Sequence, residues 1–161
     1  MQGQNFLNPI EFQFEVKRLP NVEFYVQSVN IPDISSGVTT QQTPFKNIYR
    51  PGDKVEFGDL QITCAIDENM ETYKEVWNWL IALTYPNGFE QYQALTEPSG
   101  DGLYSDATLI IANSSKNANI EINFRDIFPI NIGSIELDTT LSDVTPPRVE
   151  FTFKYAYYEF V

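Results

Sequence analysis

The chain has 161 residues, of which 42% are hydrophobic and 14% aromatic, and its acidic residues outnumber the basic ones by 22 to 10. A net charge of -12 and an isoelectric point near 4.2 exclude strong binding to nucleic acid phosphates, because such binding needs cationic side chains to displace counterions. The single cysteine excludes an intramolecular disulfide, and the absence of histidine removes the commonest catalytic base and transition-metal ligand.

The N-terminal stretch MQGQNFLNPIEF has neither the basic flank nor the unbroken apolar segment of a secretory signal. No segment approaches the run of about 20 apolar residues that a membrane helix needs. We therefore expect a protein that stays in the cytoplasm in which it is made, or in a particle assembled there.

Two strands are predicted near the N-terminus. Apolar and polar residues alternate over 11–17 (EFQFEVK), as in a strand with one buried face. A second strand is expected over 21–32, and the short Pro20-Asn21 connection predicts that the two strands form a hairpin.

Residues 33–54 (DISSGVTTQQTPFKNIYRPGDK) form a long polar segment in which Phe45, Ile48 and Tyr49 are isolated apolar residues. A structureless stretch of this length is uncommon inside a compact domain, and it is usually functional or disordered. Because its aromatic residues argue against disorder, we expect an extended loop or a loose hairpin. The alternative is an unstructured surface loop.

A buried strand is predicted over 60–66 (LQITCAI), where Cys64 is interpreted as a small core residue rather than a nucleophile. The spacing of apolar residues then changes to three and four, which predicts one amphipathic helix over 69–84. Asp67 or Asn69 is expected to cap the start of this helix.

The orientation of the helix follows from the same spacing. Trp77 is expected to face the core, and Trp79, two residues later, is expected to face a flank or a neighbouring molecule. The residues expected on the apolar face are Met70, Tyr73, Val76, Trp77, Leu80 and Leu83.

The C-terminal half predicts mostly strands. After a polar loop containing EPSGDG, two strands at 104–113 and 117–124 are expected to form a hairpin, and IFPINIGSIELD at 127–138 is expected to form an apolar bend. A long aromatic strand is expected over 148–161. In all, about six to eight strands and one helix predict a mainly β fold: an antiparallel sandwich or partly open barrel with one flanking helix. A single domain spanning 1–161 is expected from the length.

The sequence contains few of the residues and motifs that catalytic sites use. Neither a Ser-His-Asp triad nor a zinc site is possible with no histidine and one thiol, and no nucleotide-binding glycine motif is present. A hydrolase that uses a pair of carboxylates remains formally possible, because such enzymes need only two acids at a suitable distance. The acidic cluster Asp67, Glu68 and Glu71 is better explained as negative charge at a helix N-terminus than as such a pair. We therefore expect no enzymatic activity, no cofactor and no metal.

Two segments and the C-terminus resemble a known family, the tail tube proteins of contractile-tailed bacteriophages, which are related to the tube proteins of type VI secretion systems. INFRDIFPINIGSIELDTT at 122–140 resembles the family's bend before an apolar-acidic strand, and IDENMETYKEVWNWL at 66–80 resembles its acidic helix start. The aromatic final strand resembles the family's C-terminus, and the resemblance extends from about Asn5 to Val161.

The resemblance implies a virion protein whose hexameric rings stack into a hollow tube inside a contractile sheath, a conduit for DNA ejection. Its implied partners are copies of itself and the sheath, baseplate and tail terminator proteins. Double-stranded DNA passes through without specific binding, no small-molecule ligand is bound, and the tail is assembled in the host cytoplasm.

The resemblance also assigns roles to segments. Residues 1–10 are expected to form an N-terminal arm, and the 33–54 loop is expected to reach the next ring. The bend at 127–138 is expected to pack within the subunit or against its ring neighbour. The residues expected to make the ring-stacking contacts are Phe45, Ile48, Tyr49, Arg50 and Pro51.

An acidic lumen agrees with the negative charge, because phosphates do not adhere to it. The acids expected on strands that face the lumen are Glu121, Glu136, Asp138 and Glu150. The alternative is that these charges only keep the subunit soluble.

Two other functions remain open at this point. One is a tube initiator, a tube terminator or a secretion-system tube protein of the same fold. The other is a monomeric β-sandwich module that binds carbohydrate by stacking it on exposed aromatic side chains such as Tyr49, Trp79 or Tyr104.

Overall fold

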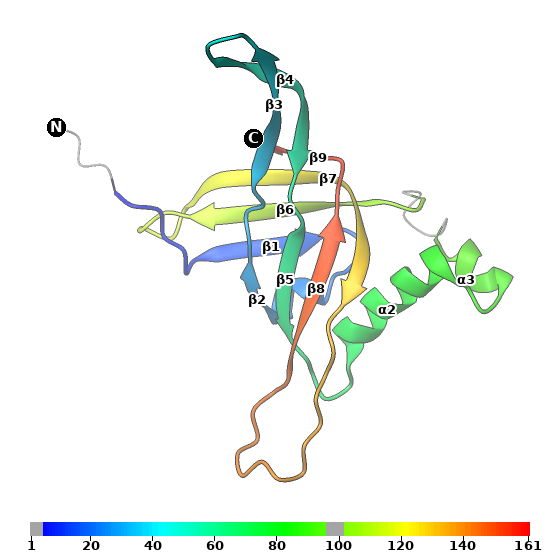
Figure 1. Ribbon diagram of the computed structural model, residues 1–161. Helices are drawn as coiled ribbons and strands as arrows, with labels where there is room; N and C mark the ends of the chain where they lie inside the picture. Colours follow the sequence, from blue (N-terminus) through cyan, green and yellow to red (C-terminus); the bar gives the residue numbers. More distant parts are fainter. Residues whose placement is uncertain (1–4, 96–101) are drawn as a thin grey trace.

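The computed structural model describes residues 5–95 and 102–161, and within them it confirms a mainly β, antiparallel fold (Figure 1). Most of the predicted EPSGDG loop lies outside the described residues. The strands are β1 (Phe12–Val16), β2 (Val26–Val29), β3 (Ile34–Gln42), β4 (Asn47–Phe57), β5 (Leu60–Ala65), β6 (Ser105–Ala112), β7 (Ala118–Ile132), β8 (Arg148–Lys154) and β9 (Tyr157–Phe160). The helices are α1 (Val22–Tyr25), α2 (Glu71–Thr84) and α3 (Phe89–Gln93).

Seven of these strands form one sheet that is folded into two layers. Its order is β1-β6-β7-β8-β5-β2, and β9 also pairs with β7. The first half of β7 pairs with β6 and β9, and its second half pairs with β8. We call β1-β6-β7-β9 layer 1 and β7-β8-β5-β2 layer 2. In Figure 1 the strands of layer 1 cross those of layer 2, and the core lies between them.

The corner between the layers lies at Asp126. This residue has a φ of 56°, in the left-handed region that Asp tolerates better than most residues. The register of β7 against β6 shifts here, between the pairs Ala107–Phe124 and Ser105–Ile127. A bulge of this kind bends a strand and allows it to pass from one sheet layer to the other.

The bend predicted at 127–138 is therefore wrong in its position. Ile127 to Ile132 continue β7, and the following residues, 133–147, form a long loop that leads to β8. The prediction took Pro129 as a residue of a bend. Proline is tolerated in a strand where the hydrogen-bond ladder is irregular, and the pairing of β7 with β8 shifts between Pro129 and Asn131.

The single C-terminal strand predicted from the alternation is two strands. β8 lies in layer 2 and β9 in layer 1, and the chain crosses between the layers at Tyr155 and Ala156. The crossing changes which residues face inward. Tyr158 packs against Phe124 in the core, whereas Tyr157 is exposed.

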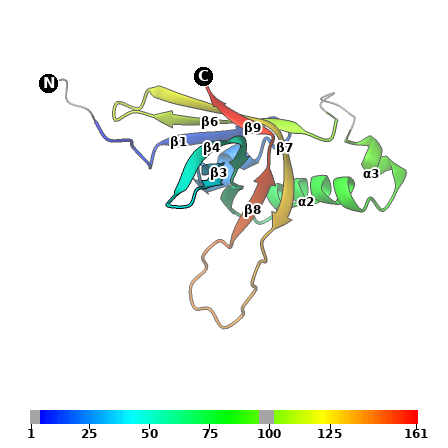
Figure 2. The ribbon, with the colours of Figure 1, turned by 45° about the horizontal axis from the view of Figure 1, so that its top comes forward.

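The predicted N-terminal hairpin is also wrong. β1 pairs with β6 in layer 1, and β2 pairs with β5 in layer 2. The connection is the short helix α1, anchored by the buried side chains of Leu19 and Val22. The 33–54 segment, by contrast, forms the hairpin that was one of its two predicted structures. Its strands β3 and β4 pair only with each other within the described residues, and they project from the body of the fold (Figures 1 and 2).

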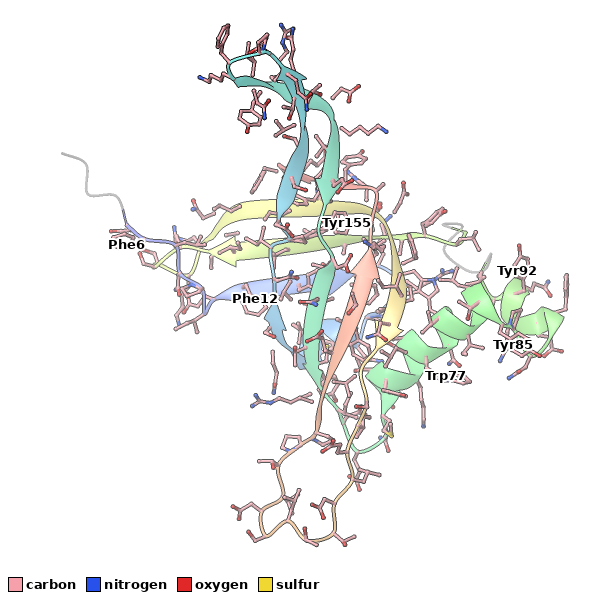
Figure 3. The ribbon with its side chains drawn as sticks, in the orientation of Figure 1. Phe6, Phe12, Trp77, Tyr85, Tyr92 and Tyr155 are labelled. Atoms are coloured by element: carbon pink, nitrogen blue, oxygen red, sulfur yellow. The ribbon has the colours of Figure 1, made fainter. Side chains whose placement is uncertain are left out.

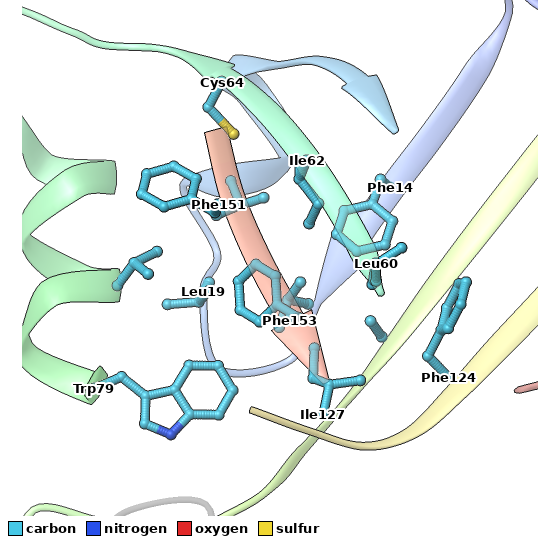
Figure 4. Close-up of a cluster of buried hydrophobic side chains, with 14 of the residues drawn as sticks. Phe14, Leu19, Leu60, Ile62, Cys64, Trp79, Phe124, Ile127, Phe151 and Phe153 are labelled. Atoms are coloured by element: carbon cyan, nitrogen blue, oxygen red, sulfur yellow. The ribbon is translucent and has the colours of Figure 1, made fainter. Parts of the chain in front are cut away.

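Helix α2 covers one end of the core, in a rotation that the sequence did not predict. The N-cap position is Met70, which has a φ of 56° and no side-chain cap. The predicted Asp67 still accepts a hydrogen bond at the helix start, since the Glu71 N–H donates to Asp67 Oδ1 at 2.9 Å. Trp79, however, is the core tryptophan. It is 4% exposed and lies near Phe153, whereas Trp77 is 39% exposed and points away from the sheets (Figures 3 and 4). The buried helix residues are Thr72, Val76, Trp79 and Ala82.

Candidate assembly surfaces

The outer face of layer 1 carries aligned polar side chains. Each strand alternates, and the register places the outward residues in rows across the four strands. One row contains Glu15, Thr108, Asn123 and Glu159. A second contains Gln13, Ile110 and Glu121, and a third contains Lys17, Asp106, Arg125 and Tyr157. The opposite face of the same strands is buried, so this layer has one core side and one polar side.

Arg125 links two acids on this polar face. Its guanidinium lies 3.2 Å from Asp106 Oδ2 and 3.2 Å from Glu159 Oε1. The hydrogen bond with Glu159, followed by the charge of Asp106, raises the pKa of Arg125. One cation is thus shared by two carboxylates, which leaves the face acidic.

Layer 1 ends in two unpaired edges. β1 pairs only with β6, and β9 pairs only with β7, within residues 5–95 and 102–161. The unpaired backbone groups of such edges can pair with a strand of another chain. Large apolar side chains are exposed beside them: Ile10 (83%) and Phe24 (78%) near β1, and Phe160 (66%) and Val161 (78%) at β9.

The predicted stacking residues all lie in the outer part of the β3–β4 hairpin and are exposed. Phe45 is 99% exposed at the turn, and Tyr49 is 69% exposed on β4. The turn is ordered by its own hydrogen bonds, since Lys46 N–H donates to Thr43 Oγ1 at 3.1 Å and Thr43 N–H donates to the Lys46 carbonyl at 3.2 Å. Ile48, Arg50 and Pro51 complete the predicted set.

The four acids predicted for the lumen do not share one surface. Glu121 lies on the polar face of layer 1, and Glu150 lies on β8 in layer 2, opposite Thr63. Glu136 and Asp138 are not on strands at all, because β7 ends at Ile132 and both acids lie in the 133–147 loop.

Sequence reasoning missed three acids of the polar face: Glu15, Asp106 and Glu159. The signal for Glu15 was available in the alternation of EFQFEVK, whose polar positions define one face. Asp106 and Glu159 were grouped with it only by strand register, which no local pattern reveals.

The aromatic residues proposed for carbohydrate stacking do not form a platform. Trp79 is buried against Phe153 and donates its Nε1–H to the Leu103 carbonyl at 3.3 Å. Tyr49 lies on the hairpin, and Tyr104 packs edge-on against Phe128 in another part of the fold.

Other kinds of site are not apparent in the part of the chain that the structure describes. No group of three or more acidic or cysteine side chains there is arranged to hold a metal, and no helix there is long and apolar enough to cross a membrane. Cys64 is buried, and burial raises the pKa of its thiol to about 12, so it is not a nucleophile.

The described residues thus form a two-layer β fold with one polar sheet face, two unpaired edges in layer 1 and a projecting hairpin. The sequence matches the family model for the phage tail tube protein over residues 5–161. The chain therefore belongs to the phage tail tube protein family, and it is a structural tube protein.

Solved structures agree with this fold. A chain of the sheath–tube complex of the extracellular contractile injection system PVC, in its extended state, is 14% identical with a TM-score of 0.61, over 96% of this chain and 90% of that one. A chain of the anti-feeding prophage cap, which terminates the tube, is 12% identical with a TM-score of 0.64, over 100% and 94%.

A type six secretion system protein is 10% identical with a TM-score of 0.54, over 92% of this chain and 81% of that one. At these identities the likeness establishes the fold alone. A search of the curated proteins finds no match.

Proposed function

We propose that the chain forms hexameric rings by pairing β9 of one copy with β1 of the next, and that the rings stack into the tube of a contractile tail. The observation that carries this proposal is the pair of unpaired edges at the two ends of layer 1. The assignment to a tube rests on membership of the phage tail tube protein family. The two unpaired edges are the surfaces that we propose to pair between neighbouring subunits of a ring.

Strand direction favours this pairing. Neighbours in layer 1 are all antiparallel, so β1 and β9 run in opposite directions. A β9 edge that meets the β1 edge of a copy related by rotation therefore continues the antiparallel order. Such a contact joins two different surfaces, and it generates a closed ring when the rotation closes.

Backbone donors are available for the contact. The Val161 N–H donates to the Glu121 carbonyl at 3.0 Å. Because successive N–H groups of a strand point to opposite sides, the Phe160 N–H points away from β7 toward the open edge. Pairing would also cover the exposed Phe160 and Ile10 side chains, and each large apolar side chain that is fully buried contributes about 1.5–3 kcal/mol.

In a ring of this kind the polar face of layer 1 lines the lumen, because the opposite face is the subunit core. Its acids are Glu15, Asp106, Glu121 and Glu159, against the cations Lys17 and Arg125. An acidic wall does not exchange counterions with DNA phosphates, so the DNA passes without binding. Of the four acids predicted from sequence, we keep only Glu121 in this role.

The β3–β4 hairpin, with Phe45 and Tyr49, is proposed to reach the next ring. The proposed partners of the tube are the sheath, the baseplate and the tail terminator of the virion, in a tail assembled in the host cytoplasm. The tube needs no catalysis, and we propose no enzymatic activity for it.

The proposal is tested by the pair Phe160→Pro and Phe160→Ala, examined by negative-stain electron microscopy and light scattering. Proline removes the outward N–H, whereas alanine removes only the ring and keeps the donor. We expect Phe160→Pro to remain a folded monomer by circular dichroism and Phe160→Ala to retain rings at higher protein concentration. Normal rings from the proline variant would contradict β9–β1 pairing, and a wild-type protein that stays monomeric at high concentration would contradict ring formation.

A further inference from the structure

Two segments that carry exposed apolar side chains lie at opposite ends of the fold. The hairpin tip, which we define as residues 39–50, projects from one end, and the 133–147 loop projects from the other (Figure 1). In the loop, Leu137 is 90% exposed and Val144 is 103% exposed, and Leu141 is also exposed. Isolated exposed apolar residues are ordinary, but clusters of them at a projecting tip indicate an interaction surface.

The two segments carry opposite charge. The hairpin tip contains Lys46 and Arg50 and no acid, although the chain as a whole has a net charge of -12. The 133–147 loop contains Glu136, Asp138 and Asp143 and no cation. Among the described residues, none of the four ion pairs involves any of these five side chains.

Both segments are locally ordered before any contact. Thr43 and Lys46 close the hairpin turn, as described above. In the loop, Asp138 Oδ1 accepts hydrogen bonds from Thr140 N–H at 2.9 Å and from its hydroxyl at 2.7 Å. These bonds lower the pKa of Asp138, so its carboxylate is ionised at neutral pH. A surface that is already ordered loses less entropy on binding.

We propose that the hairpin tip of one copy docks onto the 133–147 loop of a second copy in the adjacent ring. This inference rests on the proposed function and names the surface that receives the hairpin. Basic and aromatic side chains of the tip meet acidic and aliphatic side chains of the loop. A contact between two different surfaces at opposite ends of one subunit repeats without closing, which builds a polar stack of rings.

The proposal changes the role expected for two acids. Glu136 and Asp138 bind the next ring instead of lining the lumen, which agrees with their position in a projecting loop. The occupant is a second copy of this chain, because the complementary basic tip belongs to the same molecule. A sheath protein on the loop is an alternative that the experiment separates.

The test is a charge exchange. One variant carries Lys46→Glu and Arg50→Glu, a second carries Glu136→Lys and Asp138→Lys, and a third carries all four substitutions. We expect rings but few tubes from the first two, with the critical concentration for tube formation raised about tenfold or more, because like charges then face each other. The third variant restores the opposite charges and is expected to form tubes near the wild-type concentration.

The matched control carries Lys74→Glu on α2 and Lys116→Glu in the turn between β6 and β7, which changes the net charge as much as the first variant does but lies outside the β3–β4 hairpin and the 133–147 loop. It should form tubes normally, and adding it to the loop substitutions should not restore stacking. Ring formation and circular dichroism establish that every variant is folded.

Several results would overturn the inference. If either two-substitution variant forms tubes at the wild-type concentration, charge pairing at these surfaces is excluded. The same conclusion follows if the four-substitution variant forms rings but no tubes. Tubes that form normally but fail to bind sheath subunits would assign the loop to the sheath. A wild-type protein without rings contradicts the proposed function itself, and the inference falls with it.

Discussion

The rotation of helix α2 gives a sharp prediction, because its two tryptophans lie two residues apart and the structure buries only one. Trp79 packs near Phe153, lies 5.2 Å from the Arg18 guanidinium carbon and donates a hydrogen bond to Leu103. Trp77 is 39% exposed. We predict that Trp79→Ala destabilises the subunit far more than Trp77→Ala.

The magnitude follows from the buried area. A buried tryptophan removes about 150–250 Å² from water, worth about 4–6 kcal/mol at about 25 cal/mol per Å². Measured Trp→Ala costs in cores are about 3–5 kcal/mol. We therefore expect a loss of about 4 kcal/mol for Trp79→Ala, or a Tm lower by about 8–16 °C for a chain of this length. For the more exposed Trp77 we expect about 1 kcal/mol or less.

The assay is urea unfolding followed by far-ultraviolet circular dichroism, at a protein concentration low enough to keep the subunits dispersed. The midpoint should shift for Trp79→Ala with an unchanged slope, which indicates a change in stability rather than in the unfolded state. Equal costs for the two variants, or a larger cost for Trp77→Ala, would refute the helix rotation and restore the orientation predicted from the sequence.

Three further predictions follow from single residues. Cys64 should not react with a thiol reagent at pH 8 until the protein is unfolded, since its pKa is about 12, and rapid labelling of the native protein would contradict its burial. Gly52→Ala should weaken ring stacking, because a Cβ at this position would lie 2.3 Å from the Gly37 carbonyl oxygen and would distort the β3–β4 hairpin. Gly37→Ala is the control, since its Cβ meets nothing within 4 Å and the variant should stack normally. Equal sedimentation of the two variants would exclude this crowding. Glu75→Gln should stabilise the subunit slightly at pH 7, because burial raises the pKa of Glu75 and penalises its charged form. The native state binds the proton of Glu75 more tightly than the unfolded state does, so the stability of the wild-type protein falls as pH rises through the native pKa. The stability gained by Glu75→Gln should therefore vanish in acid. A gain in stability that persists in acid would indicate a packing effect instead.

The hairpin and the charged surfaces were partly predictable. Polar composition with isolated aromatic residues was enough to single out 33–54 and to name Phe45 and Tyr49, because a segment that buries almost nothing stands out in the sequence. Glu121 was found by its place in an alternating strand. The bounds of the 133–147 loop were not predicted, because the apolar residues at 127–138 were interpreted as a bend that packs within the subunit or against its ring neighbour.

Local patterns of amino acids were enough to predict the individual elements: the alternating strands β1, β5 and β6, the helix α2 with Asp67 at its start, and the hairpin that joins β6 to β7. These follow from period and turn chemistry, which act between residues close in the chain. Alternation tells which face of a strand is buried but not which strand lies beside it. Tertiary structure alone therefore decided that β1 and β2 separate into different layers, and that the chain changes layer at Asp126 and again after β8. It also decided that Trp79 faces the core, because the layers that α2 packs against are formed by strands distant in the sequence.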